Sequence, residues 1–191
     1  MSAKIYLDTN LIIEHCWWKF FGEGKSEKSR DVNLVEKGFQ REYNLFISYI
    51  TIMELSNHLT DWFLLGEVIK SGFGYTYFKR ERQHHNLTVE QKAFIDKVTE
   101  FYRTSKDVSY VEIDGIGKTF FSRIKLLVDN GIEFEDALHF VFATGAQCNY
   151  FATKDEEFRS RMQKIISEKI VEIPNPPNII KPQNMPEKIR V

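Results

Sequence analysis

The stretch Ile5-Tyr6-Leu7-Asp8-Thr9-Asn10 decides how this chain is interpreted. Its three apolar residues are typical of a short buried strand, and the acidic Asp8 follows them with no intervening loop. The next two residues, Thr9 and Asn10, have short polar side chains that can orient a carboxylate or a metal-bound water. The sequence therefore predicts a strand that ends directly in a polar site.

Three other acidic residues stand where comparable elements end or begin. Glu54 comes shortly after the apolar run Leu45 to Ile50, and Asp155 comes after the run Asn149 to Ala152. Asp136 lies in the first turn of an apolar helix. Because the carboxyl ends of the strands in an open parallel α/β sheet face one crevice, acidic residues placed there can converge.

Strand patterns alternate with helix patterns along the chain, which favours a parallel sheet with helices on both faces. We therefore expect an α/β fold with three layers. The expected strands cover 4–7, 45–49, 108–113 and 149–152, with a fifth, edge strand at 170–173. The expected helices cover about 11–16, 33–41, a stretch from 51 onward, 88–104, 117–129, 135–145 and 156–166. In the 117–129 helix, the inward residues should be Phe120, Phe121, Ile124, Leu127 and Val128.

The length of 191 residues suits one domain. We expect that domain to cover 1–173, with a helical insertion near 71–104. All five prolines fall after residue 173, so 174–191 is expected to be an extended tail, either loose or laid on the surface.

Composition narrows the class of protein. The formal net charge is -1, so a nucleic-acid partner would need a local basic patch or metal ions. The two cysteines show no CxxC spacing, which argues against a zinc site or a disulfide framework. We find neither a signal-type apolar segment nor an apolar stretch near the roughly 20 residues that span a bilayer. These features predict a cytoplasmic protein without a membrane partner.

Clustered carboxylates cannot all stay ionised without a cation among them. For a site made only of oxygen atoms, the usual cation is Mg²⁺ or Mn²⁺. A metal-dependent phosphodiester hydrolase is therefore the first hypothesis for the four acidic residues.

Each acidic residue also has an ordinary structural interpretation. Thr51-x-x-Glu54 is a capping-box pattern, in which Glu54 would reach back to a backbone amide. Asp136 lies where the helix dipole favours negative charge. Asp8 and Asp155 could each cap the helix that follows. Helix capping or the helix dipole can explain each acidic residue alone, so only the four residues taken together favour a metal site.

Four fragments, taken in order, resemble the PIN-domain nucleases, and among them the VapC-type toxins. They are Ile5-Tyr6-Leu7-Asp8-Thr9-Asn10, Ser48-Tyr49-Ile50-Thr51-Ile52-Met53-Glu54-Leu55, Asp136-Ala137-Leu138-His139-Phe140-Val141-Phe142-Ala143 and Ala152-Thr153-Lys154-Asp155-Glu156-Glu157-Phe158. Each fragment alone is weak, whereas four in this order are fairly specific. The resemblance leaves out the segment 71–104 and the proline-rich tail.

The resemblance implies a metal-dependent endoribonuclease, the toxin of a toxin–antitoxin pair. Asp8, Glu54, Asp136 and Asp155 would be the catalytic residues. By the same analogy Asp8, Asp136 and Asp155 would bind Mg²⁺ or Mn²⁺, and Glu54 would orient a water. Three polar residues would support them: Thr9, Asn10 and Thr153. RNA would be the substrate, and the partners would be an antitoxin protein and a second copy in a homodimer.

Two competing classes stay open. One is an inactive PIN-like module for RNA binding or assembly. The other is a different acid-site phosphoester hydrolase, although a haloacid-dehalogenase-type phosphatase would require an aspartate where Asn10 stands.

Three further signals bear on binding. The basic residues Lys79, Arg80 and Arg82 follow several aromatic residues and are the best local candidates for contacting RNA, with a solvated basic loop whose aromatics are buried as the alternative. The segment 111–119 superficially evokes a phosphate-binding loop, but Glu112 stands where that pattern needs glycine. His139 lies one turn after Asp136 and is expected to be a packed or supporting histidine rather than a metal ligand.

Overall fold

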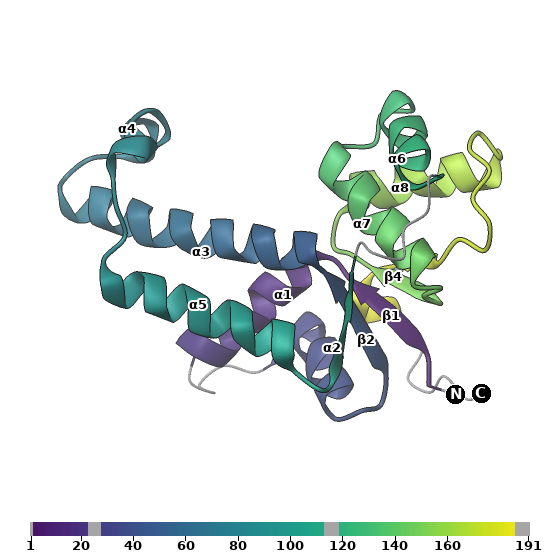
Figure 1. The fold of residues 1–191 in the computed structure, drawn as a ribbon, viewed down its shortest axis with the longest axis horizontal. Coiled ribbons are helices and arrows are strands. Elements are labelled where there is room, and N and C mark those ends of the chain that lie inside the picture. The colour runs from purple at the N-terminus through teal and green to yellow at the C-terminus, as the bar shows by residue number, and fades with distance from the viewer. Residues whose placement is uncertain (1, 23–27, 113–118, 186–191) are drawn as a thin grey trace.

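The fold is built on a parallel sheet. The computed structural model describes residues 2–22, 28–112 and 119–185. Within these residues the sheet has five strands in the order β3-β2-β1-β4-β5, and every neighbouring pair is parallel (Figure 1). The strands are β1 Lys4–Leu7, β2 Asn44–Ser48, β3 Val108–Val111, β4 Tyr150–Ala152 and β5 Asn178–Ile180. This arrangement confirms the predicted parallel α/β sheet.

Alternation along the strands divides the interior into two cores. In β1, Ile5 and Leu7 belong to one hydrophobic cluster, whereas Tyr6 belongs to the other. In β2, Leu45 and Ile47 likewise lie in the first cluster. Successive side chains of a strand point to opposite faces, so each face of this sheet has its own helical cover.

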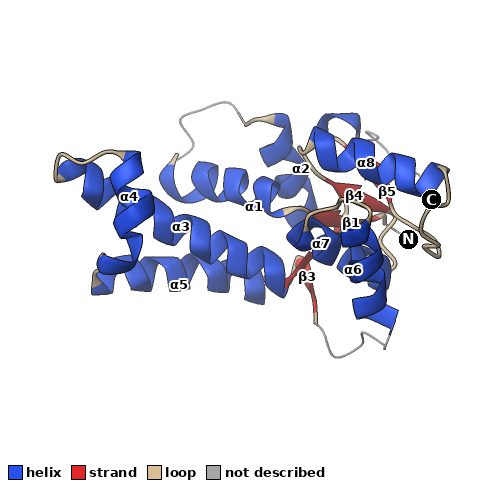
Figure 2. Ribbon diagram, turned by 90° about the horizontal axis from the view of Figure 1, so that it is seen from above, coloured by secondary structure: helices blue, strands red, loops and turns tan. Residues whose placement is uncertain are grey.

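Helices cover both faces of the sheet, as Figure 2 shows. The first core receives side chains from α1 Thr9–Cys16, α2 Arg30–Phe39, α3 Tyr49–Lys70 and α5 Val89–Thr104. The second core is closed by α6 Thr119–Asp129, α7 Phe134–Gly145 and α8 Glu156–Ser167. The predicted three layers are therefore present. None of the helices in the described ranges combines the length and apolar character needed to span a bilayer.

A helical arm extends away from the sheet. The long helix α3 runs outward, α5 returns alongside it, and the short helix α4 Tyr75–Glu81 lies at the far end (Figure 1). Phe78 fixes α4 to α3 by packing against Leu64 and Val68. A 3-10 turn, Arg82–His84, leads from α4 toward α5. The segment 71–104 is thus largely helical, and α5 also contributes to the first core.

The fifth strand was predicted at the wrong place. Residues 170–173 form no strand, and β5 lies later, within the proline-bearing tail. Lys169 is left-handed, with φ of 52°, and the N–H of Ile170 donates to the carbonyl of Ile165 in α8, so the start of the expected strand belongs to the end of that helix. Val171 is buried in the second core. Part of the expected tail therefore pairs with β4, and a 3-10 turn at Pro182–Asn184 follows it.

The inward face of α6 is narrower than predicted. Phe120, Ile124 and Leu127 are buried, whereas Phe121 is 74% exposed and Val128 is 38% exposed. Spacings of four and three residues place the buried three on one helical face, and the other two lie on the neighbouring face. The prediction was therefore wrong for Phe121 and Val128.

Several expected segments fall partly outside the described residues. The residues 113–118 lie outside the described part, and they belong in part to the phosphate-loop-like segment at 111–119, the expected strand at 108–113 and the expected helix at 117–129. The tail beyond Met185 lies outside the described part as well. Within it, Ser29 caps α2 by accepting a hydrogen bond from the backbone N–H of Val32 at 3.1 Å.

A close approach at Gly38 joins α2 to the sheet and can be tested. A methyl group added there would overlap the side chain of Leu45 in β2. Because this core is closely packed, Gly38→Ala should lower the free energy of unfolding by about 1–3 kcal/mol. Gly66, inside α3, has nothing within 4 Å of the same added atom. As the matched control, Gly66→Ala should raise stability by about 0.5–1 kcal/mol. Urea unfolding measures both, and equal effects of the two variants would contradict the packing argument.

Candidate active site

The site lies at the carboxyl edge of the sheet, where the strand order reverses. β1 pairs with β2 on one side and with β4 on the other. The chain proceeds from β1 to β2 and β3, and then returns to place β4 on the opposite side of β1. Ligands of open α/β sheets bind in the crevice at such a switch point. Asp8 follows β1 there, and Thr153 and Asp155 follow β4.

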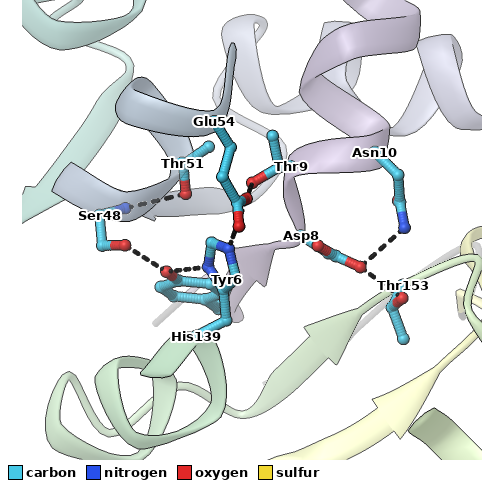
Figure 3. Close-up of polar contacts among 9 residues, drawn as sticks. All are labelled: Tyr6, Asp8, Thr9, Asn10, Ser48, Thr51, Glu54, His139 and Thr153. Atoms are coloured by element: carbon cyan, nitrogen blue, oxygen red, sulfur yellow. Dashed lines mark hydrogen bonds and ion pairs between the residues drawn. The ribbon is translucent and has the colours of Figure 1, made fainter. Parts of the chain in front are cut away.

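Asp8 is held by side chains from two different elements. Its Oδ2 accepts a hydrogen bond from Asn10 Nδ2 at 2.7 Å and another from Thr153 Oγ1 at 2.6 Å (Figure 3). Although Asp8 occupies the N-cap position of α1, its side chain makes no capping hydrogen bond. The capping interpretation is therefore wrong for Asp8. Asn10 and Thr153 contact the carboxylate that they were expected to support.

The surroundings of Asp8 disfavour its negative charge. Burial raises the pKa of this carboxyl above its ordinary value, and the nearby Glu54 charge raises it further. The charge of His139 and hydrogen bonds from Thr153 and Thr9 act in the opposite direction without cancelling the effect. A nearby cation would favour the ionised form of Asp8.

Asp136 and Asp155 line one small cleft of about 110 Å³. Asp155 Oδ1 accepts a hydrogen bond from the backbone N–H of Phe158 at 2.8 Å, so it caps α8 as the ordinary interpretation predicted. Asp136 lies in the first turn of α7, and no hydrogen bond to its carboxylate is found within the described residues. The two acidic residues thus share a cleft from different helices.

The closeness of the acidic residues affects the ionisation of Asp136. Burial, followed by the charges of Asp8 and Asp155, raises the pKa of Asp136 to about 7. Glu133 adds to the rise and His139 opposes it. A carboxyl that is destabilised by two other carboxylates marks a place where positive charge is missing.

Glu54 lies on the first turns of α3 and faces the same region. The helix begins at Tyr49, two residues earlier than predicted, and its capping box is formed by Ser48 and Thr51. The capping interpretation of Glu54 is therefore wrong. Its Oε2 accepts hydrogen bonds from Thr9 Oγ1 and, at 2.9 Å, from His139 Nε2. Burial raises the pKa of Glu54, but these two hydrogen bonds and the charge of His139 bring it below its ordinary value.

A buried series of hydrogen-bonded side chains leads from Glu54 through His139 and Tyr6 to Ser48, and the sequence predicted only the part played by His139. His139 was expected to be packed or supporting, and it is 1% exposed. Its Nδ1 lies 2.9 Å from the hydroxyl of Tyr6, which lies 2.6 Å from Ser48 Oγ. The sequence did not draw attention to Tyr6 or Ser48. A signal was present, since a tyrosine inside a buried strand must find a partner for its hydroxyl.

The donor atoms suit a divalent cation that prefers oxygen ligands. The site offers carboxylates, and beside them Asn10 Oδ1 is buried without a hydrogen-bond partner in the described residues. Carboxylate and amide oxygens are ligands that Mg²⁺ and Mn²⁺ favour. Across residues 2–22, 28–112 and 119–185, no group of three or more His, Cys, Asp or Glu side chains is arranged to hold a metal ion. The evidence that this site suits Mg²⁺ or Mn²⁺ is therefore the oxygen chemistry of its donor atoms and the mutual repulsion of its carboxylates.

The basic and aromatic segment lies largely on α4, at the end of the helical arm away from the sheet (Figure 1). Phe78 is buried as the alternative interpretation predicted, but Phe73 and Tyr75 are 49% and 57% exposed. Lys79 Nζ lies 5.0 Å from the ring centroid of Tyr75, and Arg80 lies 5.8 Å from that of Tyr77. The expected burial of the aromatics therefore fails for Tyr75, and Phe73, which precedes this segment, is exposed as well.

The three cations of this segment differ in their partners. Arg82 forms an ion pair with Asp61 of α3, and Arg80 pairs with the adjacent Glu81 at 2.7 Å. Lys79 has no carboxylate partner within the described residues. Lys79 is therefore the most available of the three for an anionic ligand.

Comparison with known proteins agrees with this geometry. A family model of the PIN domain matches residues 5–162, from β1 into α8. The chain belongs to the PIN-domain family. Proteins of this family are nucleases that generally use divalent metal ions. The match runs through the segment 71–104 that the fragment resemblance leaves out.

Other comparisons add little. No curated protein matches the chain in sequence. Among solved structures, the chain is similar to one in a structure of FitAB bound to an IR36 DNA fragment. The two are 12% identical, the alignment covers 96% of this chain and 98% of that one, and the TM-score is 0.47. A likeness of this size carries no inference about function.

The repulsion at Asp136 predicts a pH-dependent stability of the metal-free protein. Its pKa is about 7 in the folded state, so the native state holds a proton that the unfolded state releases as pH rises from about 4 to 7. Stability from this group is therefore lost over that range. Asp136→Asn should be more stable than the parent at pH 7.5 by about 1–2 kcal/mol, after allowance for solvent screening of a half-buried group. The gain should vanish near pH 4.

Thermal unfolding in the presence of a chelator measures this difference, which corresponds to about 2–8 °C in Tm at neutral pH. Asp129→Asn is the matched control, because that side chain is 51% exposed and lies at the end of α6. A variant Asp136→Asn that is no more stable than the parent at any pH would show that the carboxylates do not repel one another.

Proposed function

We propose that this PIN-domain protein is a Mg²⁺- or Mn²⁺-dependent endoribonuclease that hydrolyses RNA phosphodiester bonds. The observation that carries the proposal is the placement of three acidic residues at one edge of the sheet: Asp8 is bound by Thr153, and Asp136 and Asp155 line one cleft, with the pKa of Asp136 raised by burial and then by the charges of Asp8 and Asp155. These acidic residues, one directly after β1, one in the first turn of α7 and one in the β4–α8 connection, act on one another at the switch point of a parallel sheet. This is the charge pattern that a divalent cation would relieve.

We assign each residue of the site a role from its position. Asp8, Asp136 and Asp155 would hold one or two divalent ions, and a bound ion would lower the pKa of a water and stabilise negative charge on the phosphate. Thr153 and Asn10 fix the Asp8 carboxylate by the hydrogen bonds described above. Glu54, held by Thr9, orients the attacking water.

The proposal extends to a biological role by resemblance to the VapC-type toxins. In this role the protein is the toxin of a toxin–antitoxin pair, works in the cytoplasm as a homodimer, and is inhibited by an antitoxin peptide over the acidic site. The free, buried thiols of Cys16 and Cys148 are compatible with a reducing compartment. Size-exclusion chromatography with light scattering measures the oligomeric state, and a monomer at micromolar concentration would remove the homodimer from the proposal.

The central prediction concerns Asp8. Asp8→Asn should reduce divalent-dependent cleavage of RNA by at least about 100-fold, because the amide keeps the shape but removes the charge that holds the ion. The fold should be retained, as judged by circular dichroism. Asp129→Asn, the same change on an exposed residue, should cleave at the parent rate. Undiminished cleavage by Asp8→Asn would reject the assignment.

Two further measurements separate the competing classes. Titration calorimetry with Mn²⁺ should show binding to the parent and weaker binding to Asp8→Asn. Absence of Mn²⁺ binding by the parent would favour an inactive RNA-binding module. RNA should be cleaved in preference to a small phosphoester such as p-nitrophenyl phosphate, and the reverse preference would indicate a phosphatase.

We further propose that Lys79 and Arg80 contact the RNA backbone at the tip of the helical arm, with unpaired bases stacking on the exposed aromatics there. Arg82 was grouped with them from the sequence, and through its ion pair with Asp61 it joins the tip to α3. Base–aromatic stacking contributes about 1–3 kcal/mol per base and tolerates any sequence. The exposed ring of Tyr75 beside Lys79 has the composition of such a contact.

The tip can be tested apart from the chemistry. Tyr75→Ala in the Asp8→Asn background should weaken the binding of a short single-stranded RNA by about 5- to 30-fold, measured by fluorescence anisotropy. Lys79→Ala should weaken binding and reduce its dependence on salt. Lys125→Ala, which removes a cation from α6, is the control and should bind normally. Unchanged binding by Tyr75→Ala would place the RNA elsewhere.

A further inference from the structure

The imidazole of His139 joins two parts of the site that the sequence treats separately. It projects from α7, one turn after Asp136, and is buried between β1 and α3. Nε2 lies 2.9 Å from Glu54 Oε2 and 3.2 Å from Thr9 Oγ1, while Nδ1 lies 2.9 Å from the Tyr6 hydroxyl (Figure 3). Both ring nitrogens therefore have polar partners.

Nε2 faces Glu54 as a donor in both the neutral and the charged ring, and in the neutral ring the chemistry of the partners also determines the tautomer. An ionised carboxylate only accepts hydrogen bonds, so the nitrogen that faces Glu54, Nε2, must be a donor. In the neutral ring Nδ1 is then an acceptor, and the Tyr6 hydroxyl donates to it. Ser48 Oγ lies 2.6 Å from the Tyr6 oxygen, and because the one Tyr6 proton is directed to Nδ1, the rotatable Ser48 hydroxyl must be the donor in this pair.

The same contacts restrict Glu54. Both of its donors, Thr9 and His139, converge on Oε2. Oε1 receives no hydrogen bond from the described residues, and the side chain is 27% exposed. One oxygen is thus fixed by the protein, and the other is available to a water or a substrate. A glutamate on a solvated helix would otherwise sample several rotamers.

We propose that His139 is a positioning residue, which holds Glu54 through Nε2–H so that Oε1 can orient the attacking water, with Tyr6 selecting the imidazole tautomer. The role rests on the proposed nuclease function. It gives the buried Tyr6 hydroxyl a purpose beyond core packing, because that hydroxyl controls which ring nitrogen faces Glu54. His139 acts through Glu54 and binds no ion in this role.

Two substitutions at position 139 separate positioning from packing. His139→Gln places an amide N–H near the position of Nε2, so it retains a donor to Glu54. His139→Asn is shorter and keeps only a group near Nδ1, so Tyr6 stays paired and Glu54 loses its donor. We expect His139→Asn to lower kcat by about 10- to 100-fold with KM and Mn²⁺ affinity changed less than about threefold. His139→Gln should recover most of that kcat.

Both variants put a polar amide into the same buried position, so a purely structural role would lower their activity and Tm together. Equal kcat values for His139→Asn and the parent, with Asp8→Asn inactive, would overturn the positioning role and leave the nuclease proposal intact. Equal losses in His139→Asn and His139→Gln would overturn it as well.

A second readout needs no activity. Long-range ¹H–¹⁵N correlation spectra of the metal-free protein report the tautomer of each histidine ring. For His139 we expect a protonated Nε2 and an unprotonated Nδ1, with loss of this preference in Tyr6→Phe. The opposite tautomer, with the proton on Nδ1, would overturn the inference even if the parent protein proves to cleave no RNA. Conversely, the expected tautomer in a protein that cleaves no RNA would reject only the function on which the role rests.

Discussion

The hydrogen bond from Thr153 to Asp8 is the contact on which the site depends, because it exists only when β1 and β4 are neighbours. The two residues are 145 positions apart in the chain, and their oxygens are 2.6 Å apart. Parallel pairing brings both strands to an end at the same edge, with Leu7 beside Ala152. The residue after each strand end therefore faces its counterpart. A sheet in any other order would separate the acid from the hydroxyl that holds it.

Placing acidic residues at this edge has a cost that the fold must offset elsewhere. Asp8 is nearly buried, and Asp136 is repelled by two other carboxylates, so the ionised site destabilises the metal-free chain. Two apolar cores on opposite faces of the sheet supply the compensating stability. Glu54 differs from the other acids because donors surround it, and its charge is favoured rather than opposed. The site thus places two carboxylates whose negative charge is disfavoured, Asp8 and Asp136, near a third, Glu54, whose charge is favoured.

The features that could be predicted from the sequence are those that depend on residues close together in the chain. The alternation of strand and helix, the placement of the acidic residues at element ends, and the short polar residues beside Asp8 all follow from nearby residues. The segment 170–173 was predicted as a strand because its apolar residues are typical of one, whereas Ile170 is hydrogen-bonded back to the last turn of α8 after the left-handed Lys169. Phe121 was misread because an apolar residue on a helix can lie beside the buried face without belonging to it. The capping pattern at Glu54 does not apply because α3 begins two residues earlier than predicted, so Ser48 and Thr51 form the capping box instead.

The contacts that most restrict the chemistry are those that no local pattern contains. In the sequence Tyr6 is typical of a core residue in a strand, and its ring does stack on Phe151 on the same face of the sheet. The face that Tyr6 occupies is nevertheless the one covered by α7, so its hydroxyl reaches His139 instead of water. The alternation that separates the two cores thus also decides which side of β1 communicates with the site. Ile5 and Leu7 secure the strand on one face, which leaves Tyr6 on the other to determine, through one imidazole, how Glu54 is presented.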